Sequence, residues 1–401
     1  MTTLSDSVDN TRFVKLDLIR GVAVLGVLMV NIHLFSGPEQ WHYHPSQRPD
    51  LSGLDQGALV LTIGLMEGKF IALLSLLFGV GMALFLERYG QIAKWAHMKR
   101  MAILGCIGLL HAYGFWYGDI LVTYAITGAV AWWFLPLSPL RQIRFAVLFF
   151  ALPTGLLLWA AQSVDRWDEA TLQTMRALLY PSAETLQAKV MGYQQGFWAQ
   201  WSVRAPDAWT LQFDVLVTWT LWYTLSLMII GMLLQRQGWC VAPPIKPISW
   251  PGIGIGTVGL VLSLGVALSR VFGVPDDLAW VSFYQPVLQQ MGAFLLAFWY
   301  LLVLLSWSSA SVWVLRLAAL GRWSLSVYLL QSLLCGVLFY GHGLGWYGQR
   351  TPAEVMLLGA GISALLLWQV PKWEKCWGIG PAERLWRRAV KRPPIDARNV
   401  T

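Results

Sequence analysis

The stretch MAILGCIGLLHAYGFWYGDILVTYAITG (residues 101–128) holds two apolar runs that are joined at Gly118 and Asp119. Each run is close to the length of a helix that crosses the hydrocarbon core of a bilayer. His111 lies near the end of the first run, and Asp119 opens the second. A charge at the centre of a membrane helix costs at least about 2.5 kcal/mol, so such residues normally face a bundle interior or a polar cavity. The stretch therefore predicts a hairpin of two membrane helices with an ionisable pair at its turn.

The composition of the whole chain also indicates membrane helices. Of the 401 residues, 56% are hydrophobic and only 12% are charged, against about 25% charged in soluble domains. The predicted fold class is all-α, a polytopic integral membrane helical bundle. The net charge of +8 indicates membrane orientation and headgroup contact, and no nucleic-acid partner is expected because no basic, aromatic-rich surface is apparent. The four cysteines are isolated, so neither a disulfide framework nor a metal site is predicted.

Positive residues decide which of eleven apolar runs cross the membrane, because Lys and Arg gather in cytoplasmic loops. The run at 55–66 is shorter than the roughly 20 residues of a spanning helix, and counting it would move the basic loop from Lys94 to Arg100 to the outside. We therefore predict about ten transmembrane spans, with 55–68 as a short re-entrant or interfacial segment. The predicted spans are 18–36, 70–87, 101–117, 119–136, 143–161, 211–235, 251–271, 283–306, 323–341 and 352–371.

This topology places both termini in the cytoplasm. It predicts a cytoplasmic N-terminus at 1–17, a single transmembrane domain at 18–371 and a basic cytoplasmic tail at 372–401. The first apolar run lacks a small-residue cleavage site, so it is interpreted as a retained span.

The long outer loop at 162–210 has two interpretations, a plain surface loop or a lid over an outer cavity. Pro181 and Pro206 are predicted to break the chain there, and residues 176–200 have the pattern of an amphipathic helix.

Polar residues on the first two long spans are candidates for substrate binding. Asp17 and Arg20 stand three residues apart, on one helical face, where Arg20 either anchors the span with Asp17 as its partner or binds a phosphate group from the cytoplasm. Asn31 lies further along the same span, where hydrogen bonding between helices would also explain it. Lys69 either reaches the membrane interface or is buried and pairs with a substrate or with Asp119.

Two further groups have open interpretations. Asp119 could orient the imidazole of His111 as a general base, although a single histidine near an apolar face is often only structural. Gln331, Tyr328 and Ser332 either hydrogen-bond between helices or line a passage through the bundle.

Five sequence blocks, in a fixed order, resemble one known family. The family is that of the bacterial YeiB-like membrane proteins, which have a domain of unknown function, and the resemblance extends over most of the chain apart from the 162–210 loop and the tail. The blocks are LDLIRGVAVLGVLMVNI, KFIALLSLLFGVGMAL, GLLHAYGFWYGDILVTYAITG, GRWSLSVYLLQSLLCGVLFYGHGLGWYG and GPAERLWRRA.

The resemblance has implications for function, because this family is usually grouped with the transmembrane acyltransferases, which include heparan-α-glucosaminide N-acetyltransferase. It implies a ten-span bundle in a bacterial inner membrane, in which an acyl group from cytoplasmic acyl-CoA reaches an acceptor, commonly a sugar, on the far side. The acetyltransferase relatives place their catalytic histidine in the outer loop after the first span, where this chain has His42 and His44. The residues that match the family's motifs are Asp17, Arg20, Asn31, Lys69, His111, Gly118, Asp119 and Gln331.

The predicted function is therefore that of an integral-membrane acyltransferase. No bound cofactor is expected, acyl-CoA is the co-substrate, and the partners are the lipid bilayer and a sugar or another small-molecule acceptor. The alternative is a multi-pass transporter or exporter, in which the same residues form a proton relay or an anion site. The expected roles are His111 as base and Asp119 as its orienting partner, Arg20 on the phosphates, Gln331 along the path of the thioester, and Lys69 or Tyr124 beside the carbonyl oxygen.

Overall fold

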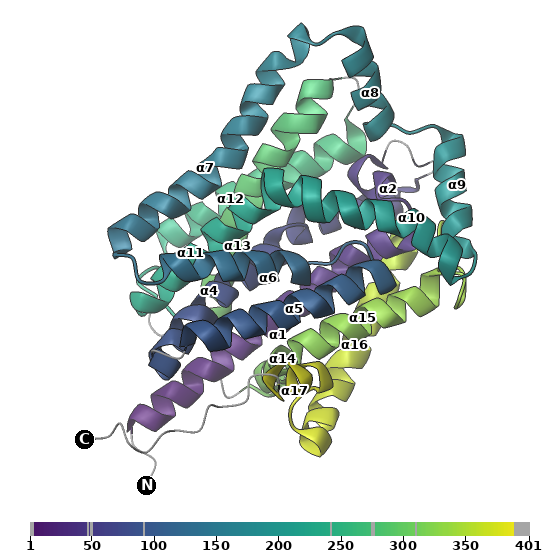
Figure 1. Cartoon of the computed structure of the whole chain (residues 1–401). Coiled ribbons are helices and arrows are strands. Elements are labelled where there is room, and N and C mark those ends of the chain that lie inside the picture. The colour runs from purple at the N-terminus through teal and green to yellow at the C-terminus, as the bar shows by residue number, and fades with distance from the viewer. Residues whose placement is uncertain are drawn as a thin grey trace.

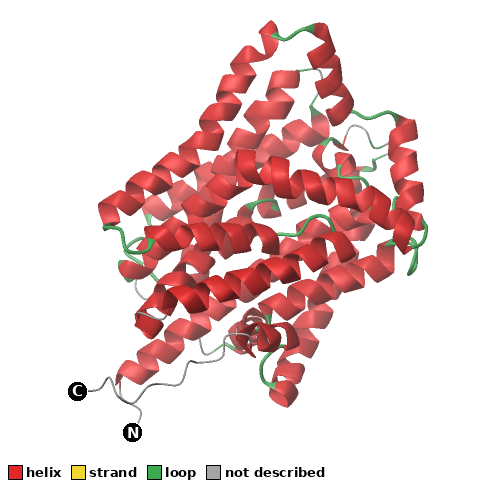
Figure 2. Cartoon of the chain, in the orientation of Figure 1, coloured by secondary structure: helices red, strands yellow, loops and turns green. Residues whose placement is uncertain are grey.

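The computed structural model describes residues 4–45, 48, 51–90, 93–240, 243–273, 277–308 and 311–388. Within these ranges every regular element is helical and no strand occurs (Figure 2), which confirms the predicted all-α class.

The helices form one bundle (Figure 1). Three π-helical segments, η2 (Thr62–Met66), η6 (Leu211–Thr220) and η7 (Trp280–Tyr284), and two short 3₁₀ turns, η4 (Trp132–Phe134) and η5 (Val164–Arg166), adjoin them. In chain order the α-helices are α1 (Leu4–Ser36), α2 (Gln40–Tyr43), α3 (Gly53–Leu61), α4 (Lys69–Tyr89), α5 (Ala93–Gly114), α6 (Leu121–Ala131), α7 (Pro139–Ser163), α8 (Glu169–Leu179), α9 (Ala183–Gln194), α10 (Phe197–Thr210), α11 (Leu221–Arg236), α12 (Trp250–Phe272), α13 (Gln285–Ser306), α14 (Val312–Arg322), α15 (Ser324–Phe339), α16 (Pro352–Trp377) and α17 (Pro381–Arg388).

Local sequence signals set the ends of several helices, and α16 shows them most fully. The Thr351 side chain accepts a hydrogen bond from the Glu354 backbone, and the Glu354 side chain accepts one from the Thr351 backbone. Pro352 occupies the first helical position, where its missing N–H costs nothing. Gly378 ends the helix with a φ of 69°, a conformation that favours glycine.

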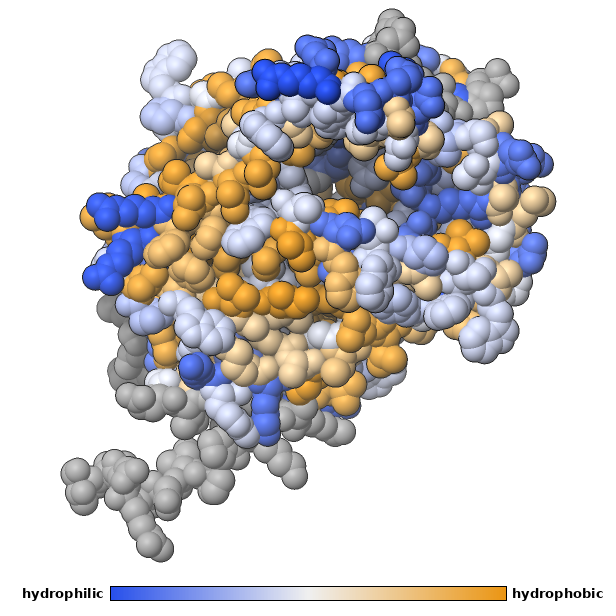
Figure 3. Space-filling view, turned by 45° about the horizontal axis from the view of Figure 1, so that its top comes forward, coloured by the Kyte–Doolittle hydropathy of each residue, from blue (hydrophilic) through white to orange (hydrophobic). Residues whose placement is uncertain are grey.

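Helix α1 is at the centre of the bundle, and α7, α12 and α16 are at its periphery. In the apolar part of α1, 72% of the residues are buried, against 17% in α7. Leucines of α7 such as Leu148 and Leu156 are half exposed. Apolar residues cover much of the middle of one molecular face in Figure 3. A soluble protein rarely exposes an apolar surface of this extent, so these outer helices contact lipid in a polytopic membrane protein.

The number of spans is lower than predicted. Seven helical stretches in the described ranges are long and apolar enough to cross a membrane, or eight if α14 and α15, which meet at 81°, form one broken span. The prediction of about ten was therefore too high by this measure. The two missing spans are α5, which carries Lys94, Lys99 and Arg100 in its first turns, and the stretch Leu121–Phe134, which is shorter than the roughly 20 residues needed.

The run at 55–66 does not form a separate span. It corresponds to α3 and η2, which count together with α4 as one stretch, Gly53–Tyr89. Gly68 separates η2 from α4 with a φ of 80°, a left-handed conformation that glycine adopts without steric cost. Inside the bundle, α3 contacts α12 and α16.

The predicted outer loop at 162–210 is largely helical. Pro181 separates α8 from α9, as predicted, but Pro206 lies inside α10. The prediction that Pro206 breaks the chain was therefore wrong, because α10 continues through η6 into α11 as the stretch Phe197–Arg236. Residues 176–200 form parts of three helices with breaks between them, where a single amphipathic helix was expected. Helices α8 and α9 lie at one end of the bundle and α17 lies towards the other (Figure 1).

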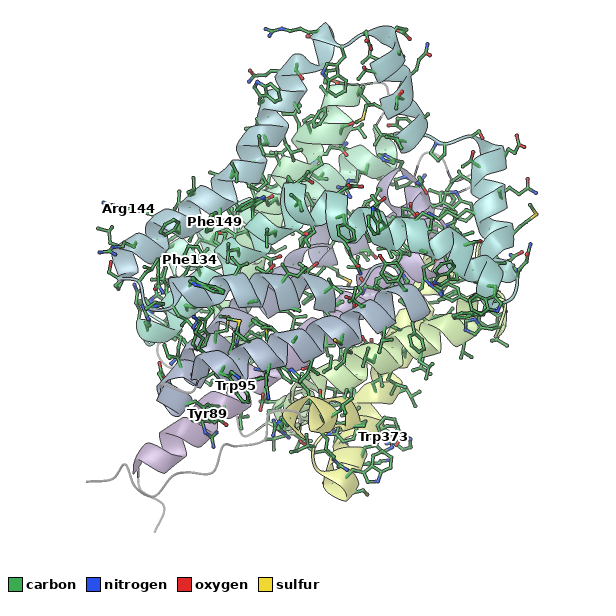
Figure 4. The ribbon with its side chains drawn as sticks, viewed as in Figure 1. Tyr89, Trp95, Phe134, Arg144, Phe149 and Trp373 are labelled. Atoms are coloured by element: carbon green, nitrogen blue, oxygen red, sulfur yellow. The ribbon has the colours of Figure 1, made fainter. Side chains whose placement is uncertain are left out.

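The end of the bundle beside α17 is rich in basic and aromatic residues. Figure 4 shows Tyr89 at the end of α4, Trp95 in α5 and Trp373 in α16 towards this end, as expected for aromatic rings at a membrane interface. We call it the basic end, and define it by Arg20, Arg100, Arg322 and Arg387.

A glycine contact between α1 and α14 leads to a first prediction. A Cβ atom on Gly21 would lie 1.9 Å from the carbonyl oxygen of Leu317. We expect Gly21→Val to lower the free energy of unfolding by about 1–3 kcal/mol, because the two helix backbones would have to separate. Thermal unfolding in detergent would measure this loss. Gly361→Val is the matched control, since a Cβ on Gly361 meets no atom within 4 Å, and an equal loss in both variants would contradict the prediction.

Candidate active site

A cavity of about 360 Å³ lies inside the bundle, between α1, α4, α5, α6, α14, α15 and α17. Its lining at the basic end includes the arginines that define that end. Further in, the lining is mostly aliphatic, for example Val27 and Leu104, and it reaches the phenol rings of Tyr124 and Tyr328. The cavity therefore combines a cationic mouth with an apolar interior.

The arginines at this mouth are held by neighbouring side chains. Arg20 donates to Asp17 over 2.6 Å, which confirms the predicted pairing, and Arg322 lies 3.9 Å from the same carboxylate. Arg322 also donates to Glu374 over 2.7 Å, and Arg100 stacks on Trp386 at 4.1 Å. Guanidinium groups in this arrangement present planar sets of donors that match phosphate oxygens.

His111 and Asp119 are in direct contact at the hairpin. His111 Nδ1 lies 2.8 Å from Asp119 Oδ1, and both side chains are buried. The second oxygen of Asp119 accepts from the backbone N–H of Val122 at the start of α6. A carboxylate at Asp119 can only accept, so it favours the tautomer in which His111 donates from Nδ1 and Nε2 carries the lone pair.

That lone pair faces Ser332 of α15. The distance from His111 Nε2 to Ser332 Oγ is 2.9 Å. The three side chains therefore form a hydrogen-bonded series of carboxylate, imidazole and hydroxyl inside the bundle. Sequence reasoning placed Ser332 only among possible polar wall residues, because nothing local relates it to His111.

Arg204 of α10 supports the hairpin and was missed by sequence reasoning. Its side chain is 1% exposed, and it donates to the carbonyl oxygens of Tyr113 and Phe115. These carbonyls follow His111 at the end of α5, where a helix leaves its acceptors unsatisfied and favours a cation. Arg204 lies within the predicted outer loop, and a charged residue in a loop carries no signal for such a partner.

The cavity reaches the neighbours of His111. Tyr328 lines the cavity, and its ring centroid is 5.1 Å from that of His111. Ile120, beside Asp119, also lines it. Tyr124 lines the cavity as well, and its hydroxyl donates to the carbonyl of Ile71. The structure thus brings Arg20 and Tyr124 to one cavity that ends beside the His111–Asp119 pair.

Three other predicted site residues lie apart from this cavity lining. Lys69 is fully buried and donates to the carbonyl of Ile63 over 2.8 Å. The suggested Lys69–Asp119 pairing is wrong, since among the described residues no ion pair joins them and Asp119 binds His111.

Gln331 and Asn31 also lie outside the cavity lining. Gln331 donates to the Val24 carbonyl of α1, so it forms a hydrogen bond between two helices, which is one of its two predicted roles. Asn31 is half-buried on α1, about three turns beyond Arg20.

A second histidine–carboxylate pair lies at the opposite end of the bundle. His42 Nε2 is 3.0 Å from Glu67 Oε2, and Arg270 donates to Oε1 of the same carboxylate over 2.9 Å. Sequence reasoning missed Arg270, although a lone arginine at the outer end of a predicted span contradicts the charge rule and indicates a carboxylate partner. Burial, and then the charge of Arg270, lower the pKa of His44 to about 4. His44 is therefore a weak base, and His42 is the histidine of this loop with a carboxylate partner.

Comparison with known proteins gives two relatives and one family. The chain is 28% identical to the uncharacterized protein YeiB of Escherichia coli over 387 residues, which are 95% of this chain and 97% of YeiB. It is 25% identical to the uncharacterized protein YxaH of Bacillus subtilis, with 97% of each chain covered. Residues 234–393 match the family described as "Protein of unknown function (DUF418)". No solved structure matches the chain. These findings confirm the resemblance read from the sequence: over nearly its whole length the chain is similar to the YeiB-like bacterial membrane proteins, which have a domain of unknown function.

Proposed function

We propose that this protein is an integral-membrane acyltransferase, which takes an acyl group from acyl-CoA at the basic end and passes it to a small hydroxyl or amine acceptor. The observation that carries the proposal is the cavity, with its arginine mouth and apolar interior. Acyl-CoA has the matching form, because its phosphates are at one end and its acyl thioester is at the other. The phosphates would bind Arg20 and Arg322, and the thioester would lie near Tyr328, beside His111.

The His111–Asp119 pair supplies the base that such a reaction needs. With its Nδ1 proton bound to Asp119, the imidazole can accept a proton at Nε2. The phenol of Tyr328, which lines the cavity, is placed to donate to the thioester carbonyl oxygen as negative charge develops there. The hydroxyl of Tyr124 could do so only after it leaves the Ile71 carbonyl. Because the cavity ends beside this pair, donor and base come within reach of each other.

The alternative function is transport of a small molecule. One observation favours it, which is the cluster of ionisable groups at the opposite end, where Lys69 is buried and the side chains of Glu67 and Arg270 are only 14% and 9% exposed. Such residues inside a membrane protein often mark ion or proton pathways.

A single reconstituted preparation tests both functions. The purified protein is placed in vesicles of phosphatidylethanolamine and phosphatidylglycerol with [¹⁴C]acetyl-CoA and a panel of sugars. Acyltransfer predicts release of free CoA thiol together with a labelled product. Movement of a labelled sugar across the vesicle membrane, driven by a proton gradient and independent of CoA, would instead support transport and contradict the proposal.

The arginine mouth gives a prediction that separates binding from chemistry. Since a hydrogen bond to a charged group contributes about 1.5–3 kcal/mol, we expect Arg20→Gln to raise KM for acetyl-CoA by roughly 10–100-fold and to change kcat little. S-acetylpantetheine lacks the nucleotide phosphates, so its KM should not respond to the substitution. Arg144→Gln is the control, because Arg144 is exposed at the start of α7 and outside the cavity lining (Figure 4). Equal KM changes for both thioesters would contradict the phosphate role of Arg20.

A further inference from the structure

We propose that Ser332 is the nucleophile of this site, and that it carries the acyl group as an ester between acyl-CoA and the acceptor. The inference rests on the proposed acyltransfer, and it adds a covalent intermediate to that reaction. It assigns a catalytic role to a residue that neither the motifs nor the comparisons single out.

The geometry is that of an activated serine. Asp119 Oδ1 is 2.8 Å from His111 Nδ1, and His111 Nε2 is 2.9 Å from Ser332 Oγ. The order of groups is therefore nucleophile, base and orienting carboxylate, which recurs on unrelated folds and is recognised by geometry and not by sequence position. All three residues are less than 9% exposed, so water competes little for these hydrogen bonds.

The hydroxyl of Ser332 differs in its bonding from those of Ser75 and Thr154. A serine or threonine in a membrane helix commonly donates to the carbonyl four residues earlier, as Ser75 does to Ile71 over 2.8 Å and Thr154 does to Phe150 over 2.9 Å. The corresponding distance from Ser332 to the Tyr328 carbonyl is longer, 3.3 Å. The contact to His111 Nε2 is the shorter of the two, so with the Nδ1 proton hydrogen-bonded to Asp119 the imidazole is the nearer acceptor for the single hydroxyl proton.

The cavity ends one helical turn before Ser332. Tyr328 lines it on the same face of α15, four residues earlier, and packs against His111. A thioester at the inner end of the cavity would therefore lie beside Tyr328, one helical turn of α15 away from Ser332.

The reaction balances with the groups at hand. Ser332 Oγ forms a bond to the thioester carbonyl carbon while its proton passes to His111 Nε2. The C–S bond breaks, and the departing sulfur takes that proton to give CoA-SH and the acyl ester of Ser332. In the second half, the acceptor hydroxyl gives its proton to His111 and attacks the ester, and Ser332 Oγ leaves and recovers the proton.

Two reagents test the nucleophile, one of them independent of acyl-CoA. The reconstituted protein is treated with a fluorophosphonate probe, or briefly with [¹⁴C]acetyl-CoA and acid, and the labelled peptide is identified by mass spectrometry. We expect both labels on Ser332, loss of both in Ser332→Ala, and strong reduction in His111→Ala. Acyl transfer should fall by at least about 100-fold in Ser332→Ala. Ser263→Ala is the control, since Ser263 is a buried serine of α12 outside the cavity lining, and it should label and react normally.

The outcomes distinguish this inference from the proposed function. Transfer that survives in Ser332→Ala, with unchanged thermal stability, would overturn the nucleophile and leave a direct acyltransferase. Absence of both labels from Ser332 would overturn it as well. Fluorophosphonate labelling of Ser332 without any CoA release by the wild-type protein would support the nucleophile and overturn acyl-CoA as the donor.

Discussion

Replacement of His111 by alanine is expected to lower the rate of acyl transfer by about 10²–10⁴-fold, the usual contribution of a positioned general base. In the proposed reaction, His111 Nε2 is the proton acceptor, and it lies 2.9 Å from Ser332 Oγ, near the inner end of the cavity. Binding of acetyl-CoA should change little, because the proposal places the phosphates at the other end of the cavity. Steady-state kinetics of CoA release in vesicles would separate the two effects.

Asp119→Asn is a companion variant with a distinct expectation. An amide at this position would no longer require His111 to hold its proton on Nδ1, so the productive tautomer would lose its preference. The side-chain volume is nearly unchanged, so the bundle should still fold. His342→Ala is the control, since its ring bonds Gln200 at 3.0 Å, away from the cavity lining.

The second histidine pair supplies the result that would contradict this assignment. If His111→Ala retained full activity and His42→Ala lost it, the base would be His42 with Glu67, at the opposite end of the bundle. The proposed acyltransferase would then stand with a different proton acceptor.

Replacement of Arg270 by alanine is expected to destabilise the fold by about 3–5 kcal/mol. The side chains of Arg270 and Glu67 are only 9% and 14% exposed and lie 2.9 Å apart. Removing one partner leaves a largely buried carboxylate without its main counter-charge, and this costs more than the pair itself contributes. Equilibrium or thermal unfolding in detergent would measure the loss.

Two further variants test whether loss of the Arg270–Glu67 ion pair causes the destabilisation in Arg270→Ala. The double variant Arg270→Leu with Glu67→Leu removes both charges and should recover most of the stability. Arg166→Ala removes an exposed arginine and should change stability by less than about 0.5 kcal/mol. If Arg270→Ala behaved like Arg166→Ala, the buried ion pair would not hold this end of the bundle together.

Much of the architecture could be predicted from local patterns. The runs that became α1, α4, α7, α12, α13 and α16 are uninterrupted and long, so hydropathy alone located them. The errors came where charge or length was borderline, as in α5 and α6, and where a proline was interpreted as a breaker although α10 accommodates it. The pairing of Asp17 with Arg20 was predictable because three residues on a helix bring two side chains to one face.

Composition and short spacings are enough to predict the all-α membrane class, the location of most apolar spans and the two close polar pairs, Asp17 with Arg20 and His111 with Asp119. The contact of Ser332 with His111 across 221 residues, and that of Arg270 with Glu67 across 203, follow from helix packing alone. This is because a helix in lipid is apolar on its outer and inner faces alike. Periodicity therefore does not show which face turns inward, and only the packing of the helices selects which buried polar groups come together.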